Sequence, residues 1–157
     1  MLMRRKIADL VYSQMEKDKN VWVIVADLGY KMWDQCFLDF PDRCINVGAS
    51  EQSMIGIAVG LSLSGKIVFC YSISTFLLYR PFEWIRNFLS WGQVPVKLLA
   101  GGRDKDYEID GITHDASDIK KYMPDVVQYW PEKEEELDKI FREMLMNKKP
   151  SFLSLRR

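Results

Sequence analysis

Apolar positions along the chain follow two alternating spacings. In residues 7–15 they recur every three or four positions, which is typical of one face of a helix. Residues 21–26 (VWVIVA) instead form a continuous apolar run of strand length, typical of a strand buried on both faces of a parallel sheet. Similar short runs predict five further strands, at residues 43–47, 66–71, 95–100, 126–129 and 150–155.

Helical patterns separate these runs. After the first helix, they lie at residues 32–40, 51–63, 81–91, 118–122 and 132–146. Pro81 suits the first position of its helix, and Gly92 stands just past the end. Strands that alternate with helices at this spacing predict an α/β fold. We expect one domain over residues 1–157, an open three-layer sandwich with a mostly parallel sheet of about six strands.

Composition narrows the function classes. The 157 residues include 22 basic and 22 acidic side chains, so the basic excess typical of nucleic-acid or anionic-membrane binding is missing. No run of eighteen apolar residues predicts a transmembrane helix. Three cysteines (Cys36, Cys44 and Cys70) fit no metal-ligand spacing and are expected to be buried free thiols. The expected compartment is the reducing cytoplasm.

Ligands of open parallel sheets bind beyond the carboxyl ends of the strands. The segments expected there are residues 26–28, 48–51, 72–79 and 101–114. None contains a dinucleotide-binding or P-loop glycine pattern, so phosphate binding by this chain alone has no support. The single histidine, His114, has no Ser or Cys at a recognisable nucleophile elbow, which disfavours a hydrolase.

Glu51 is the most suggestive single residue, because it precedes the apolar run of residues 54–63. Two interpretations stand. Ser50 as helix cap and Glu51 in the first turn complement the helix dipole without any catalytic role. Alternatively, Glu51 is a carboxyl group held in an apolar pocket and directed at a ring nitrogen of a ligand.

Four segments, in order, resemble one enzyme family. Residues 40–52 (FPDRCINVGASEQ) resemble the segment that carries the catalytic glutamate of transketolases and of 1-deoxy-xylulose-5-phosphate synthases. Residues 74–79 (STFLLY) are similar to the family's Thr-Phe-Leu segment, and residues 110–114 (DGITH) to its Asp-Gly-Pro-Thr-His loop. Residues 26–28 (ADL) match the end of its first strand. The resemblance covers roughly residues 20–130, and the tail also resembles the last strand of the family's pyrimidine-binding domain.

This resemblance implies thiamine diphosphate as cofactor, whose thiazolium carbon must lose a proton. Glu51 would hydrogen-bond the aminopyrimidine ring nitrogen and favour the imino tautomer that takes this proton. Phe76, Tyr79 and Phe82 correspond to the aromatic wall around the pyrimidine, with core packing as the alternative for Phe82. Asp27 would lie near the cofactor across a subunit interface, with an ordinary helix cap as its alternative.

The family's substrate-binding groups are matched only in part. Asp110 and His114 match residues that contact the donor's hydroxyl groups, and His114 is placed with Glu51 among the catalytic residues. The phosphate-binding arginine corresponds to Arg157 or its neighbour Arg156. A phosphate-binding histidine would fall at about Gly102 and a serine at about Lys31, so both are missing. We considered Arg103 and Lys105 as replacements, with ordinary solvated loop residues as the alternative.

The family's domain for diphosphate and magnesium, with its Gly-Asp-Gly motif, has no counterpart here. The resemblance therefore implies a small subunit of a split enzyme, whose partner subunit holds Mg, in a heterotetramer of two copies each. Three hypotheses follow. The first is ketol transfer from a ketose or sugar phosphate to an aldose. The second is 2-oxo acid decarboxylation with carboligation, as in deoxyxylulose-phosphate synthase or a 2-oxo acid dehydrogenase beta subunit. The third is a non-catalytic partner-binding module.

Overall fold

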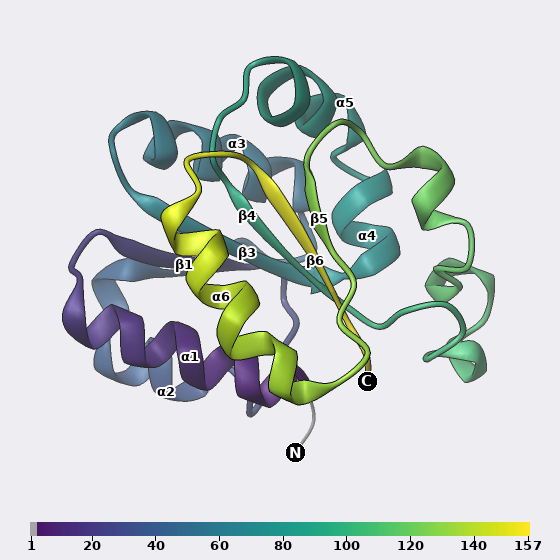
Figure 1. The fold of residues 1–157 in the computed structure, drawn as a ribbon, viewed down its shortest axis with the longest axis horizontal. Coiled ribbons are helices and arrows are strands. Elements are labelled where there is room, and N and C mark those ends of the chain that lie inside the picture. Colours follow the sequence, from purple (N-terminus) through teal and green to yellow (C-terminus); the bar gives the residue numbers. More distant parts are fainter. Residues whose placement is uncertain (1–2) are drawn as a thin grey trace.

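A computed structural model describes residues 3–157 as a six-stranded parallel sheet between two layers of helices (Figure 1). Every strand that the apolar runs predicted is confirmed, with shifts of one or two residues at the ends. The strands are β1 (Val21–Val25), β2 (Cys44–Asn46), β3 (Ile67–Ile73), β4 (Lys97–Gly101), β5 (Val127–Tyr129) and β6 (Ser151–Leu155). Their order across the sheet is β2-β1-β3-β4-β6-β5, and each neighbouring pair is parallel. The α/β class and the parallel sheet are therefore confirmed.

The two faces of the sheet bury separate apolar clusters. Along β1, Val23 and Val25 point into one cluster, while Ile24 joins the other. The same alternation recurs in β3, where Phe69 and Cys70 belong to opposite clusters. Successive side chains of a strand point to opposite faces, so a strand covered by helices on both sides must be apolar throughout.

Helices cover both faces of the sheet (Figure 1). One face carries α1 (Met3–Lys17), α2 (Asp34–Asp39) and α6 (Leu137–Met146), and the other carries α3 (Glu51–Leu63), α4 (Ser74–Tyr79) and α5 (Phe82–Trp84). None of the helices in residues 3–157 is long and apolar enough to cross a membrane. The cysteines Cys36, Cys44 and Cys70 are buried free thiols, as expected.

The region after β3 differs from the expectation. No helix was expected at residues 74–79, but they form α4, whose buried side chains include Leu77 and Leu78. Pro81 precedes α5 instead of beginning the helix, and Ile85–Trp91 continues as a π-helix. The wider turn is visible where the Gly92 amide bonds the Asn87 carbonyl, five residues back.

Short helical turns connect these elements, and one of them lies in the segment of residues 118–122 that was expected to be a helix. Four of them are 3-10 turns, at Pro41–Arg43, Glu108–Asp110, Ile112–His114 and Ile119–Tyr122. A further 3-10 turn, Glu134–Glu136, precedes α6, so the helix expected from residue 132 begins as an α-helix only at Leu137.

The chain changes direction across the sheet at β1. The connection through α2 leads from β1 outward to β2, and the next connection, through α3, returns over β1 to β3 on the opposite face. Neighbouring strands whose connections leave on opposite faces create a crevice at their carboxyl ends. The ends of β1 and β3 are therefore where a ligand site is expected, and α3 begins beside them.

Candidate functional site

Glu51 lies inside the protein at this crevice. It is the first residue of α3, yet only 1% of its surface is exposed. The Ser72 hydroxyl, near the end of β3, donates a 3.0 Å hydrogen bond to Glu51 Oε1. Ser50 stands at the N-cap, but its hydroxyl pairs with that of Ser53 instead of capping the backbone. A carboxylate complements a helix dipole without being buried, so the dipole alone does not account for this burial.

Arg80 supplies the charge that faces Glu51. Its Nη1 lies 2.8 Å from Glu51 Oε2 and 3.0 Å from Oε1. The guanidinium carbon, Cζ, lies 3.7 Å from the centroid of the Phe76 ring. A planar cation is thus in contact with an aromatic face and with a buried carboxylate at once.

Arg80 was not among the expected site residues, although its position relative to Phe76 is a signal for it. Phe76 and Arg80 are four residues apart, which places them on the same side of a continuous helical turn. Because no helix was expected at residues 74–79, this spacing carried no meaning. With residues 74–79 in a helix, Arg80 at its end lies on the same side as Phe76.

His114 joins the site from a distant part of the chain. Its ring meets Phe76 edge to face, with centroids 4.8 Å apart and planes at 67°. The Thr75 hydroxyl donates a 2.7 Å hydrogen bond to the Thr113 carbonyl, which fixes the 112–114 turn against α4. Thr113 Oγ1 lies 3.0 Å from His114 Nδ1. The structure therefore brings Glu51, Phe76 and His114 together through Arg80 and Thr75.

Three other expected site residues have different neighbours. Tyr79 donates a 2.7 Å hydrogen bond to Asp118 and packs edge-on against Tyr122. Burial and this bond to a carboxylate raise the pKa of Tyr79. Phe82 is partly exposed at the start of α5, outside both core clusters. Asp110 is exposed in the turn that precedes His114.

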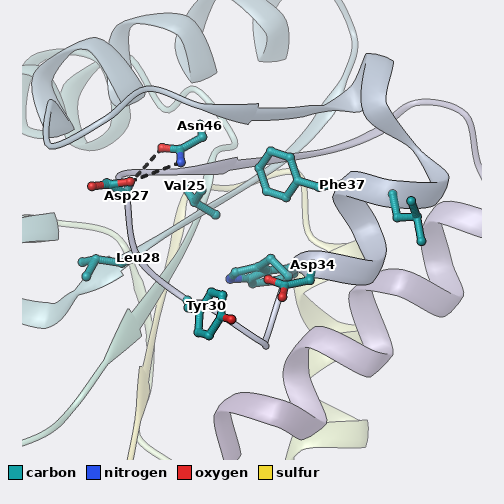
Figure 2. Close-up of a pocket in the computed structure, with 10 residues that line it drawn as sticks. Val25, Asp27, Leu28, Tyr30, Asp34, Phe37 and Asn46 are labelled. Atoms are coloured by element: carbon teal, nitrogen blue, oxygen red, sulfur yellow. Dashed lines mark hydrogen bonds between the residues drawn. The ribbon is translucent and has the colours of Figure 1, made fainter.

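Asp27 lines a separate open cavity of about 550 Å³ between the end of β1 and α2 (Figure 2). Its amide donates a 3.0 Å hydrogen bond to Asn46 Oδ1, and Asn46 Nδ2 lies 3.4 Å from Asp27 Oδ1. These two hydrogen bonds between the ends of β1 and β2 support a left-handed backbone at Asp27, where φ is +53°. Asp27 does not cap a helix, so that alternative is wrong.

Arg103 and Lys105, the cationic residues considered for phosphate binding, differ in their exposure to solvent. Arg103 is buried, and its guanidinium bonds Ser154, the Pro131 carbonyl and Glu132. It is engaged within the fold and does not replace a ligand contact, contrary to that suggestion. Lys105 is exposed beside Glu108.

The end of the chain is held against the same loop. Arg157 is exposed, its amide bonds Asp106, and its guanidinium lies over the Tyr107 ring. Arg156 forms ion pairs with Asp104 and Asp106. The chain end therefore carries two cations beside the loop that follows β4.

The structure gives a physical reason for glycine at position 102. Gly102 has a φ of +84°, and a Cβ built there would lie 2.2 Å from the Tyr107 ring. Any side chain, histidine included, would require both a strained backbone and a displaced Tyr107. Lys31, the other departure, also has a left-handed backbone, with φ of +62°. Residues 3–157 contain no cluster of three or more His, Cys, Asp or Glu placed to hold a metal ion.

Comparisons with known proteins agree with this geometry. Residues 1–157 match the family model described as "Transketolase, pyrimidine binding domain". A putative transketolase C-terminal section from Methanocaldococcus jannaschii is 34% identical over 133 residues, which cover 82% of this chain and 42% of that protein. The 6-deoxy-6-sulfo-D-fructose transketolase subunit SqwH of a Clostridium species is 28% identical over 99% of this chain and 49% of its own length.

A solved structure shares the whole fold. A split-gene transketolase described as an inactive beta4 tetramer superposes with a TM-score of 0.85 and 25% identity, covering all of this chain and 52% of that one. The present chain thus spans about half the length of these similar proteins.

Proposed function

Because this chain belongs to the family of transketolase pyrimidine-binding domains, we propose that it is part of a split, thiamine-diphosphate-dependent transketolase. In this proposal it transfers a two-carbon ketol unit from a ketose or ketose phosphate to an aldose. Activity requires a partner subunit that carries the diphosphate-binding domain. The observation that carries the proposal is Glu51, a carboxylate buried at the switch point of the sheet beside Phe76 and His114.

The residues present fit the pyrimidine end of the cofactor. An aminopyrimidine needs an aromatic face for stacking and a buried carboxyl group at its edge. Phe76 and Glu51 offer these two features to a single planar group that bears nitrogen atoms. The Arg80 guanidinium is such a group, and it contacts both residues in this structure. Phe76 is accordingly the stacking residue of the proposal, while Tyr79 and Phe82 form the outer part of the aromatic wall.

The chemistry assigned to this chain is proton control and orientation. The bound cofactor would supply a nucleophilic ring carbon and a cationic ring that serves as the electron sink. Glu51 shares a proton with a ring nitrogen, and Ser72 holds Glu51 Oε1 in place. The dry surroundings of Glu51 strengthen this hydrogen bond, because water does not compete for the carboxylate.

Substrate contacts are proposed from the loops around this centre. His114, which contacts Phe76, is proposed to bind a donor hydroxyl group and to take part in catalysis. Asp110 lies in the preceding turn and Arg157 at the end of the chain, both exposed, as substrate-binding residues must be before the complex forms. Asp27, which lines an open cavity, is proposed to lie near the cofactor across the subunit interface.

The partner is proposed to bind the diphosphate and Mg, within a heterotetramer of two copies of each subunit. The aromatic side chains on the outer side of α5 and the π-helix support an interface there. Trp84 and Phe88 are stacked and partly exposed, and Trp91 is 87% exposed. Such apolar surface is typical of a protein interface. The three free thiols agree with assembly in the cytoplasm.

Reconstitution with the candidate partner tests this function. The two chains, co-expressed, are assayed for ketol transfer with and without thiamine diphosphate and Mg. We expect cofactor-dependent turnover by the mixture and by neither chain alone. Release of carbon dioxide from a 2-oxo acid donor would instead favour decarboxylation with carboligation. A stable complex inactive with both donor classes would favour a non-catalytic module.

Glu51→Gln tests the assigned centre within that complex. The variant keeps the size of the side chain but cannot share the proton, so we expect kcat to fall at least about 100-fold with assembly intact. Glu16→Gln, the same change on an exposed residue of α1 on the other face of the sheet, is the matched control. Full activity of Glu51→Gln would remove Glu51 from the mechanism.

A further inference from the structure

Arg80 makes two contacts that together define a planar slot. Its Nη1 is 2.8 Å from one oxygen of Glu51 and 3.0 Å from the other. Its Cζ is 3.7 Å from the Phe76 ring centroid, which is direct contact between two flat groups. Glu51 is 1% exposed, whereas the Arg80 side chain is 45% exposed. Glu51 and Phe76 therefore form the walls of the slot, and it is filled by Arg80, whose side chain reaches solvent.

The guanidinium and an aminopyrimidine would satisfy the same groups. Both are flat, conjugated and rich in N–H groups, and both would stack on Phe76 and hydrogen-bond Glu51 at an edge. Two flat groups cannot occupy the same face of one ring at contact distance. Occupation of the slot by Arg80 and by the pyrimidine is consequently mutually exclusive.

The ion pair between Arg80 and Glu51 is also favourable when no cofactor is bound. A buried carboxylate without a counter-charge is costly, and Ser72 alone supplies only one neutral hydrogen bond. Arg80 compensates the charge while the slot holds no ligand. Its long stem, anchored at the end of α4, allows the charged group to move into water without rearranging the backbone.

We propose that Arg80 is an internal occupant of the pyrimidine slot, which thiamine diphosphate must displace before Glu51 becomes available to the cofactor. This inference rests on the proposed function and adds a control on it. The apparent affinity of a ligand falls by the fraction of molecules in which the slot is open. If Arg80 fills the slot in about nine molecules of ten, the apparent Kd for the pyrimidine is about tenfold weaker than that of an open slot.

The test uses the full chain and the free pyrimidine half of the cofactor, 4-amino-5-hydroxymethyl-2-methylpyrimidine, as probe. Binding is measured by NMR titration for the wild type, Arg80→Gln and Arg80→Ala. The matched control is Arg86→Gln, because Arg86 is an exposed arginine of the π-helix whose side chain bonds its neighbour Asn87. We expect both Arg80 variants to bind the probe about tenfold more tightly than the wild type, and Arg86→Gln to match the wild type.

A second readout needs no variant and so does not depend on variant folding. The N–H protons of Arg80 lie near the Phe76 ring in the wild type and should carry ring-current shifts. Saturation with the probe should move these signals to the positions of a solvent-exposed arginine. Signals that keep their ring-current shifts at saturation would overturn the proposal, as would Arg80 variants that bind the probe no better than the wild type.

The outcome is separable from that of the proposed function. Absence of probe binding in every variant would also overturn the inference, since opening the slot should expose both Phe76 and Glu51. The proposed function would still be decided by cofactor-dependent turnover of the assembled complex. Conversely, if the Arg80 variants bind the probe more tightly but the assembled complex has no turnover, Arg80 occupies the slot and the proposed transketolase activity is wrong.

Discussion

Lys97 provides a quantitative test of the packing, at the end of the sheet away from the candidate site. It is the first residue of β4 and is 3% exposed. Its ammonium donates hydrogen bonds to the Asn147 carbonyl (2.9 Å), Asn147 Oδ1 (2.7 Å) and the Lys149 carbonyl (2.7 Å). These acceptors are neutral, so they do not compensate the charge. Burial lowers the pKa of Lys97 from 10.5 to about 8.

The lowered pKa fixes the sign of a pH effect. Between about pH 8 and 10.5 the unfolded chain holds this proton more tightly than the folded one, so the Lys97 contribution to stability rises with pH. Below pH 8 the buried charge costs its full amount. One pKa unit corresponds to about 1.4 kcal/mol, which makes this cost about 3 kcal/mol and its relief between pH 7 and 9 about 1.4 kcal/mol.

Urea unfolding of the wild type and Lys97→Met at pH 7, 8 and 9 measures this effect. We expect the free energy of unfolding of the wild type, relative to the variant, to rise by about 1.4 kcal/mol over this range. The buried thiols act in the opposite direction above pH 9, but they are common to both proteins and cancel in the difference. Lys148→Met, at an exposed lysine, is the control and should show no such rise. A difference that stays flat or falls with pH would refute the reasoning.

Two further predictions concern buried polar groups. In a urea titration, Arg103→Lys should lower the free energy of unfolding by about 3 kcal/mol, because an ammonium cannot reach all the acceptors of the buried guanidinium. The control Lys105→Arg, at an exposed site, should change the free energy of unfolding by less than about 0.5 kcal/mol. An Arg103→Lys variant as stable as the wild type would contradict the assigned contacts. The pKa of Cys36 is raised by burial to about 11 and that of Cys44 to about 12. Labelling of the native chain with an aromatic disulfide reagent at pH 8 should therefore be at least about 100-fold slower than in urea, and rapid native labelling would show that the thiols are accessible.

The candidate site was only partly predictable. Glu51 stood out because it follows a strand and a short turn and leads directly into an apolar helix, which placed it at the correct edge of the sheet. Phe76 and His114 were assigned through the family resemblance, since nothing local links residues 38 positions apart. Their 4.8 Å contact exists because α4 and the 112–114 turn pack together beyond β3 and β4.

Arg80 and Arg103 show where sequence reasoning failed. Both are charged residues outside a predicted element or in a predicted loop, and such residues are usually solvated. Arg103 is buried because acceptors from β6 and from residues 131–132 converge on it, and these segments are distant in sequence. Arg80, at the end of α4, faces Glu51, at the start of α3, and no local pattern links these two helix ends.

The sequence by itself determined the strands, most of the helices and the two-sided burial of the sheet, because periodicity reports how each segment meets water. It also determined which carboxylate to examine. Only the tertiary structure decided which side chains meet that carboxylate, why residue 102 is a glycine, and which arginines are engaged. The physical reason is that these contacts depend on strand order and helix packing, which join residues with no local relation in the chain.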